Sequence, residues 1–267
     1  MNQYPQHGGP HGQWGQQQGG QYGQWGQQQG PHAGMVQGMG AVDFNAVQER
    51  ARAFVWKAYA WMSVGLGITG VVAMVLASLA NTPLRPIIFN PVVYFGSMAV
   101  TLVLVFVLSA ARNRLDPMVA GGLFFVYAAL NGIWMSAIFL VYTASSIAST
   151  FFVCAGMFAA TSAFGYVTKR DLTGVGHFAL MGLIGLILAS IVNIFVASHM
   201  LYWLVTYAGV IIFVALTAYD TQKLRQLGGM GMDAKTEAKA SIQGALMLYL
   251  DFINLFLFLL RLFGNRR

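Results

Sequence analysis

The chain has 267 residues, of which 57% are hydrophobic and only 9% are charged. A soluble globular protein carries about 25% charged residues because its surface faces water, so this composition excludes an ordinary soluble domain and indicates a membrane protein. The formal net charge is +7, but the basic residues lie between apolar runs rather than in one patch. We therefore expect no nucleic-acid partner, and we attribute these charges to the orientation of spans in a lipid bilayer.

The first 42 residues form a separate polar segment in which the octapeptide GQWGQQQG occurs twice, at 12–19 and 23–30. A segment without an apolar run cannot bury enough surface to offset the entropy lost on folding, so we expect a disordered tail over 1–42. It also lacks the short apolar region of a secretory signal peptide. The polar stretch 43–52 is expected to form an amphipathic helix on the membrane surface before the first span.

Seven apolar runs follow the tail, each close to the ~20 residues that an α-helix needs to cross the hydrocarbon core. They cover 55–80, 92–111, 118–142, 147–167, 177–197, 201–219 and 241–263. Most connections between them are short, which predicts antiparallel neighbours in one bundle; a longer polar loop is expected over 221–239. The predicted fold class is an all-α integral membrane protein, with a seven-transmembrane-helix domain over 43–267.

Lysine and arginine residues in the loops predict the orientation of the chain. One side collects most of them, and we expect it to be cytoplasmic, together with the N-terminus: Arg50, Arg52, Lys57, Arg112, Arg114, Lys169, Arg170, Lys223, Arg225, Lys235 and Lys239. The other side has only Arg85, Arg266 and Arg267. The two terminal arginines argue against an external C-terminus, and a last segment that does not cross fully would place both ends inside.

Asp251 lies in the middle of the last apolar run, with no basic residue within a helical turn. A charge at the bilayer centre costs several kcal/mol, roughly 2.5–3.5 on insertion scales, and usually marks an ion pathway or a proton relay. At helical spacing Asp251, Asn254 and Arg261 share one face, which should point into the bundle. The alternative is a structural aspartate that joins two helices by a hydrogen bond.

Asp220 ends the sixth run, and Thr217 lies one turn earlier on the same face. It could be an interfacial residue that pairs with Lys223 or Arg225. If it instead approaches Asp251, two carboxyl groups in a medium of low dielectric cannot both ionise at low cost, so the pair could share a proton. Such a pair would be closed at low pH and repelled apart at higher pH. The available cations are Arg112 and Arg114, which could equally be ordinary orientation signals.

Other chemistries lack the residues that they need. A retinal pigment requires a lysine in the last span, and a zinc hydrolase requires clustered histidines; three of the five histidines lie in the tail and two at span ends. A serine hydrolase needs a base beside its nucleophile, which no span offers. Cys154 has no partner for a disulfide, and we expect it to be a core residue. We therefore expect neither an enzyme nor a protein with a fixed metal or cofactor site.

The last two spans closely resemble those of the Bax inhibitor-type family, the transmembrane Bax inhibitor motif proteins. The resemblance is carried by ALMLYLDFINLFLFLLRLFG at 245–264 and TAYDTQK at 217–223. The segments ARNRL at 111–115 and FVYAALNGI at 125–133 are similar to the region of the second and third spans of that family. The chain therefore looks like a bacterial-type member, with six helices around a central last helix, in the cytoplasmic (inner) membrane.

This resemblance implies a pH-sensitive calcium-leak channel or transporter, tied in eukaryotes to suppression of cell death. It assigns the pH-sensing pair of aspartates to Asp220 and Asp251, with Thr217 and Asn254 as nearby polar groups. The arginine that pairs with them matches Arg114 in an ungapped comparison, or Arg112. The expected partners are the lipid bilayer, Ca2+ and H+. One bacterial relative binds a membrane AAA protease, so a non-conducting regulator of a protease or a stress partner is the alternative function.

Overall fold

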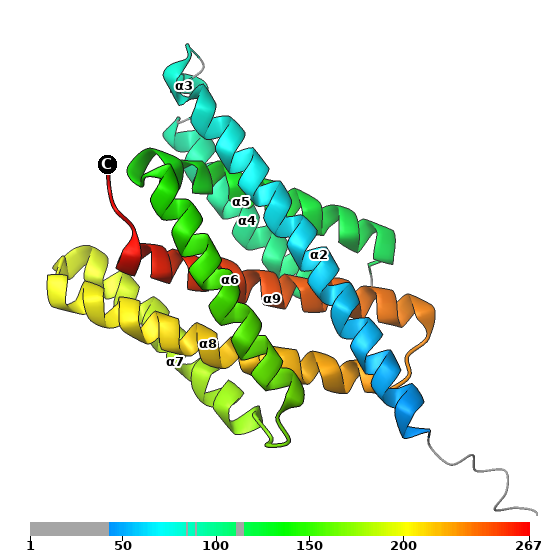
Figure 1. Cartoon of the computed structure of the whole chain (residues 1–267). Helices are drawn as coiled ribbons and strands as arrows, with labels where there is room; N and C mark the ends of the chain where they lie inside the picture. The colour runs from blue at the N-terminus through cyan, green and yellow to red at the C-terminus, as the bar shows by residue number, and fades with distance from the viewer. Residues whose placement is uncertain (1–42, 84, 89, 111–114) are drawn as a thin grey trace, which may run out of the picture. The chain divides into compact units, whose positions relative to one another are not determined.

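The computed structural model describes residues 43–83, 85–88, 90–110 and 115–267. Within these ranges seven helices are long and apolar enough to cross a membrane (Figure 1). They are α2 (Phe44–Ser78), α4 (Pro91–Ala110), α5 (Pro117–Val141), α6 (Ala144–Val167), α7 (Thr173–Val196), α8 (His199–Gly229) and α9 (Ala234–Phe263), and the short η1 (Leu79–Asn81) and α3 (Arg85–Ile88) lie between α2 and α4. The predicted all-α membrane fold with seven spans is confirmed, while the predicted tail, 1–42, lies outside the described residues.

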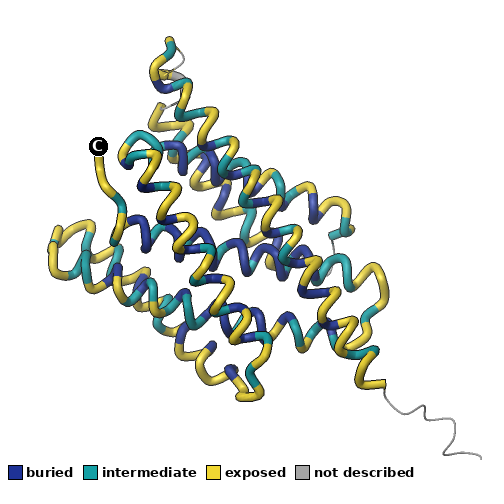
Figure 2. The backbone as a smooth tube through the Cα atoms, in the orientation of Figure 1, coloured by how far each residue is buried: buried dark blue, intermediate teal, exposed yellow. Residues whose placement is uncertain are grey.

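The last helix, α9, lies at the centre of this domain. It contacts α2, α5, α6 and α8, whereas α4 packs mainly against α5 and α7 against α8. In the most apolar stretch of α9, 61% of the residues are buried, compared with 11% in α7. Figure 2 shows the same contrast along the two helices. The expected central position of the last helix is therefore confirmed, and α7 presents most of its side chains outward, where lipid would lie.

The predicted helix over 43–52 is present, but it is not a separate element before the first span, because residues 44–52 are the first turns of α2. Asp43 is the N-cap, and its carboxylate accepts hydrogen bonds from the backbone N–H groups of Asn45 at 3.0 Å and Ala46 at 3.4 Å. Ala51 and Phe54 are buried against Gly228 of α8. Packing against another helix, rather than against a membrane surface, explains why one helix continues through this polar stretch.

The predicted loop over 221–239 is wrong, since α8 continues to Gly229 and α9 already begins at Ala234. The polar composition misled the prediction because part of this stretch faces protein: Thr221, Gln222 and Leu224 are buried. The turn itself needs only 230–233, where Gly231 has a φ of +68°. This left-handed conformation favours glycine, because it is the residue that adopts it without steric cost.

We name the two ends of the domain by their connections. The loop end carries the start of α2 and the α6–α7 and α8–α9 connections; there the Gln222 side chain donates to Arg170 O at 2.8 Å and accepts from Leu172 N at 2.8 Å. The far end carries the α5–α6 and α7–α8 connections and the residues after α9, where Thr143 N donates to Asn265 O at 3.1 Å. These contacts tie the connections of each end together.

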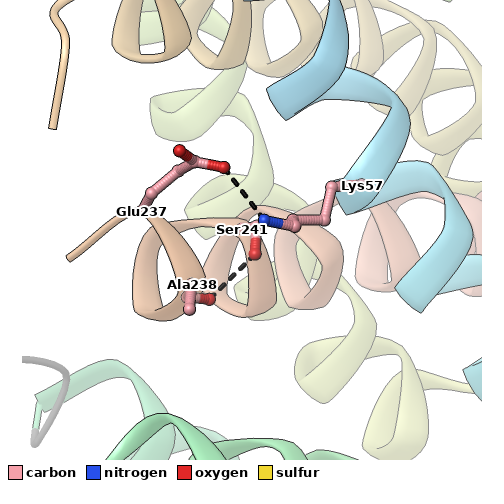
Figure 3. Close-up of polar contacts among 4 residues, drawn as sticks. All are labelled: Lys57, Glu237, Ala238 and Ser241. Carbon is pink, nitrogen blue, oxygen red and sulfur yellow. Dashed lines mark hydrogen bonds and ion pairs between the residues drawn. The ribbon is translucent and has the colours of Figure 1, made fainter. Parts of the chain in front are cut away.

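Two exposed ion pairs hold the first turns of α9 at the loop end. Lys57 Nζ of α2 lies 3.0 Å from Glu237 Oε1, beside Ser241, whose hydroxyl donates to Ala238 O (Figure 3). Lys235 Nζ lies 3.3 Å from Asp116 Oδ2, the N-cap of α5. The pKa of the Asp116 carboxyl is lowered by the hydrogen bond from Met118 N and by Lys235. Ionised Asp116 thus joins the starts of α5 and α9.

A glycine allows α6 and α8 to approach at backbone distance. A Cβ atom on Gly165 would lie 2.2 Å from Ala218 O and 2.9 Å from the Ala218 Cα atom. Backbone atoms cannot rotate aside, so any side chain here would push α6 and α8 apart. Gly156, on the same helix, is exposed and has open space around its Cβ position.

We expect Gly165→Ala to lower the stability of the domain by about 1–3 kcal/mol, the usual cost of overpacking a well-packed interface. Gly156→Ala is the matched control and should be neutral or slightly stabilising, because alanine favours helix more than glycine does. Thermal unfolding of both variants in detergent would test this. Equal melting temperatures would contradict the close approach of α6 and α8.

Candidate functional site

Asp251 places a carboxyl group in the interior of the domain. It lies near the middle of α9, is only 4% exposed, and is flanked by the buried residues Leu248, Phe252 and Leu255. Its Oδ2 atom has no hydrogen-bond partner within the described part of the chain. A buried charge without partners is costly, so this carboxyl needs a proton, a cation or a second polar group beside it.

Asp220 of α8 supplies a second carboxyl group next to the first. The two side chains are close enough for an electrostatic interaction, although Asp220 is only partly buried. Two carboxyl groups this close share a proton readily, whereas two negative charges in the same place repel each other. The action of Asp220 and Asp251 as one proton-sharing pair stays a prediction.

The basic neighbours of Asp220 along α8 contact tyrosine rings. Arg225 donates from Nη1 to Tyr166 O and lies over the Tyr166 ring, and Lys223 Nζ lies 5.7 Å from the centre of the Tyr219 ring. Within the described ranges, no salt bridge to Asp220 is formed. Lys223 is nevertheless close enough to Asp220 for an electrostatic interaction, so the interpretation of Asp220 as an interfacial residue beside Lys223 stays open.

The other predicted residues stand apart from the two carboxyl groups. Thr217 is fully buried, but its hydroxyl donates to Phe213 O of its own helix at 2.7 Å. Asn254 likewise donates to Leu250 O at 2.8 Å. The candidate arginines, Arg112 and Arg114, lie outside the described residues, so their predicted contact with the aspartates stays a prediction.

Tyr59, which the sequence reasoning missed, links Asp251 to two further hydroxyl groups. Tyr59 of α2 and Thr221 of α8 form a hydrogen bond of 3.0 Å. The same tyrosine hydroxyl is near Ser162 of α6 and close enough to Asp251 for an electrostatic interaction. Ser162 Oγ is buried and has no partner at hydrogen-bond distance within the described residues. The two carboxyl groups thus lie in a polar patch to which four helices contribute.

A groove connects this patch to the outer surface between α2 and α6. It has a volume of about 330 Å³, and its lining includes Arg52 and Tyr59 of α2, Ser162 and Tyr166 of α6, and Thr221 of α8. Tyr59 and Thr221 therefore lie between the groove and the aspartates. Neither aspartate lines the groove, and most of its exposed surface is apolar.

Toward the far end, the interior beyond the aspartates is closed by apolar packing. The rings of Phe213 on α8 and Phe258 on α9 stack with their centres 5.9 Å apart, and both are buried. Gly209 makes room for Phe258, because a Cβ atom there would lie 2.6 Å from the ring. This apolar packing lies on the far-end side of Asp220 and Asp251 along α8 and α9.

A pattern in α6 could have revealed part of this patch. Five buried residues of α6 follow one another at intervals of four, and all except Phe158 are small or polar: Ser146, Thr150, Cys154, Phe158 and Ser162. Cys154 is a core residue as predicted, with its Sγ 3.8 Å from Phe252 O of α9. Within the described ranges, no three histidine, cysteine, aspartate or glutamate residues cluster as metal ligands.

Comparison with known proteins assigns the chain to a family. The family model described as "Inhibitor of apoptosis-promoting Bax1" matches residues 51–267. The chain is 52% identical over 225 residues to "Inner membrane protein YbhL" of Escherichia coli (strain K12), covering 83% of this chain and 96% of that protein. It is 42% identical to a protein of Deinococcus radiodurans, covering 82% and 93% of the two chains. A protein of Rickettsia prowazekii is 41% identical, with 82% and 92% covered. The chain therefore belongs to the Bax inhibitor family and is an integral, multi-pass membrane protein.

Proposed function

We propose that this protein is a pH-sensitive calcium-leak channel or transporter, in which Asp220 and Asp251 form the gate. The observation that carries the proposal is the pair of neighbouring carboxyl groups inside a membrane domain. Ionisable residues at such depth usually serve ion or proton movement. Carboxylate oxygens are also the ligands that Ca²⁺ prefers. Membership in a family of membrane regulators or channels is consistent with this role.

The gate would work through repulsion between the two aspartates. At low pH a shared proton holds α8 and α9 together at this level, and the path stays closed. At higher pH both groups ionise, repel each other and attract a divalent cation. Arg112 or Arg114 would stabilise the ionised pair from the second span. The groove between α2 and α6 provides an entry from the loop end, which we propose to face the cytoplasm.

Replacing either carboxyl group should strongly reduce Ca²⁺ flux. We expect Asp220→Asn and Asp251→Asn to reduce flux into liposomes about tenfold or more, because the loss of ~1.4 kcal/mol of interaction with the ion at the barrier changes a rate tenfold. Asp171→Asn is the matched control, since Asp171 is exposed at the loop end. Unchanged flux in both interior variants would refute the proposal.

The parent protein should conduct more at high pH than at low pH. Between about pH 5 and about pH 8, deprotonation of the pair increases both repulsion and attraction for Ca²⁺, so flux should rise with pH. The two asparagine variants should lose this response, because a single carboxyl group has no partner with which to share a proton. A pH profile of fluorescent-dye flux measures this directly, and a response retained in either variant would contradict the shared-proton gate.

A second candidate function is a non-conducting regulator that binds a membrane AAA protease or a stress partner. It is favoured by a hollow of about 620 Å³ at the loop end, formed by the start of α2 and the ends of α6 and α8, with Arg225, Gln226 and Met230 in its lining. Met230 is 71% exposed, as expected for a contact with another protein rather than for a core residue.

Copurification with a membrane AAA protease tests this second function. We expect Met230→Asp, or deletion of residues 1–40, to reduce protease recovery about tenfold if that surface or the tail forms the contact, since one hot-spot residue contributes ~1.4 kcal/mol or more. Asp251→Asn should leave recovery unchanged. If the parent, Met230→Asp and the variant without residues 1–40 recover equal amounts of protease, neither the Met230 surface nor the tail binds it.

A further inference from the structure

The far end of the domain carries arginines without acidic partners. The chain has eight acidic residues, and each lies at the loop end or on an interior segment of α8 or α9: Asp43, Glu49, Asp116, Asp171, Asp220, Asp233, Glu237 and Asp251. The far end nevertheless holds Arg261 and Arg266. Spans are normally flanked by arginines on one side only, so this pair needs a reason other than orientation.

The two arginines converge on one polar hollow. It has a volume of about 570 Å³ and lies between the end of α7, the start of α8 and the end of α9. Besides Arg261 and Arg266, its lining includes His199, Tyr202 and Trp203 of α8. Three segments that are distant in sequence thus direct cationic and hydrogen-bonding groups into the same space.

Arg266 is held in place by the backbone around it. Arg267 N donates to Val141 O at 2.9 Å, so the residues after α9 are fixed against the α5–α6 connection. The Arg266 guanidinium lies over the Tyr142 ring and donates to Tyr202 Oη at 3.4 Å. Its pKa is raised by the hydrogen bond with Tyr142. A fixed backbone and aromatic support position the side chain before any ligand arrives.

Arg261 keeps its donors free. Its guanidinium lies over the rings of Phe258 at 5.2 Å and Tyr202 at 5.8 Å, and it makes no hydrogen bond or ion pair within the described residues. A guanidinium has five N–H donors in a planar fork that fits a phosphate or a carboxylate. The dipole of α9 stabilises a positive charge in the last turn of the helix. This accounts for the position of Arg261 but not for its unused hydrogen-bond donors.

The start of α8 adds a further positive potential to the same hollow. His199 is the first residue of α8, after the N-cap Ser198, and the N-terminus of a helix attracts anions. His199 Nε2 accepts a hydrogen bond from Trp203 Nε1 at 3.0 Å, so the ring is oriented by its neighbour. Two guanidinium groups and a helix N-terminus therefore surround a space that contains no acidic side chain.

We propose that this hollow is a binding site for a phosphate group, supplied in the membrane by the headgroup of an anionic phospholipid. Exposed apolar side chains that could contact the acyl chains lie within two positions of lining residues on α7 and α8: Phe195 is 84% exposed and Met200 81%. Trp203 and Tyr202 match the aromatic residues that gather at the level of lipid headgroups. A free phosphate ion has the same chemistry but no use for these apolar surfaces.

Lipid retention by the purified full chain tests the site. Native mass spectrometry would compare phosphatidylglycerol with phosphatidylcholine, and inorganic phosphate would be titrated as a separate arm. Each arginine near a membrane surface changes the affinity for an anionic lipid roughly fivefold. The double variant Arg261→Gln/Arg266→Gln should therefore bind phosphatidylglycerol about 30-fold more weakly. Arg261→Gln alone removes no hydrogen bond within the described residues and should weaken binding about fivefold while the protein remains folded.

Arg85→Gln is the matched control, because it removes one positive charge from α3, outside the hollow, and should retain the lipid normally. Selective retention of phosphatidylglycerol that the arginine variants lose supports the lipid source. Arginine-dependent binding of inorganic phosphate without lipid selectivity supports the phosphate site with a soluble anion as its source. The proposal would be overturned if the parent and Arg261→Gln retained equal amounts of phosphatidylglycerol. It would also be overturned if Arg85→Gln lost as much of this lipid as Arg261→Gln does. None of these readouts depends on ion flux.

Discussion

A carboxyl group at the centre of an enclosed helix is the constraint on which the rest of this structure depends. Asp251 would be expensive against lipid, because a charge at the middle of a bilayer costs roughly 2.5–3.5 kcal/mol on insertion scales. The fold avoids that contact by surrounding α9 with α2, α5, α6 and α8. The same enclosure brings Asp220 of α8 and Tyr59 of α2 near it. The burial of α9 thus places polar groups of the neighbouring helices close to Asp251.

The position of α8 links the packing of the domain to the chemistry of the aspartates. Gly165 lets α6 touch the backbone of α8 at Ala218, two residues before Asp220. Phe213 and Phe258 join α8 to α9 on the far side of the pair. Asp220 therefore lies on a segment held from both sides, and a small shift of α8 against α9 changes the separation of the carboxyl groups. A closely packed interior transmits such shifts because it has few voids to absorb them.

Sequence reasoning predicted the spans and the interior face of Asp251, because hydrophobic run length and an isolated charge are strong local signals. It failed at the polar ends of helices. The segment 221–229 was assigned to a loop on composition, but its burial against α2 is a long-range contact that no local pattern contains. Tyr59 was missed for the same reason: a tyrosine in an apolar run gives no sign that its hydroxyl lies near Thr221, 162 positions away.

The two ends of the domain use their charges in different ways, and this difference follows from where the acidic residues lie. At the loop end, Lys57 and Lys235 pair with Glu237 and Asp116, so two of the cations there have acidic partners within the chain. None of the eight acidic residues lies at the far end. Arg261 lines the hollow there, and its N–H donors have no partner within the described residues. A cation without an internal partner must be satisfied by solvent, by lipid or by a ligand. The membrane supplies phosphate groups at this depth, so the lipid itself becomes the counterion that the sequence lacks.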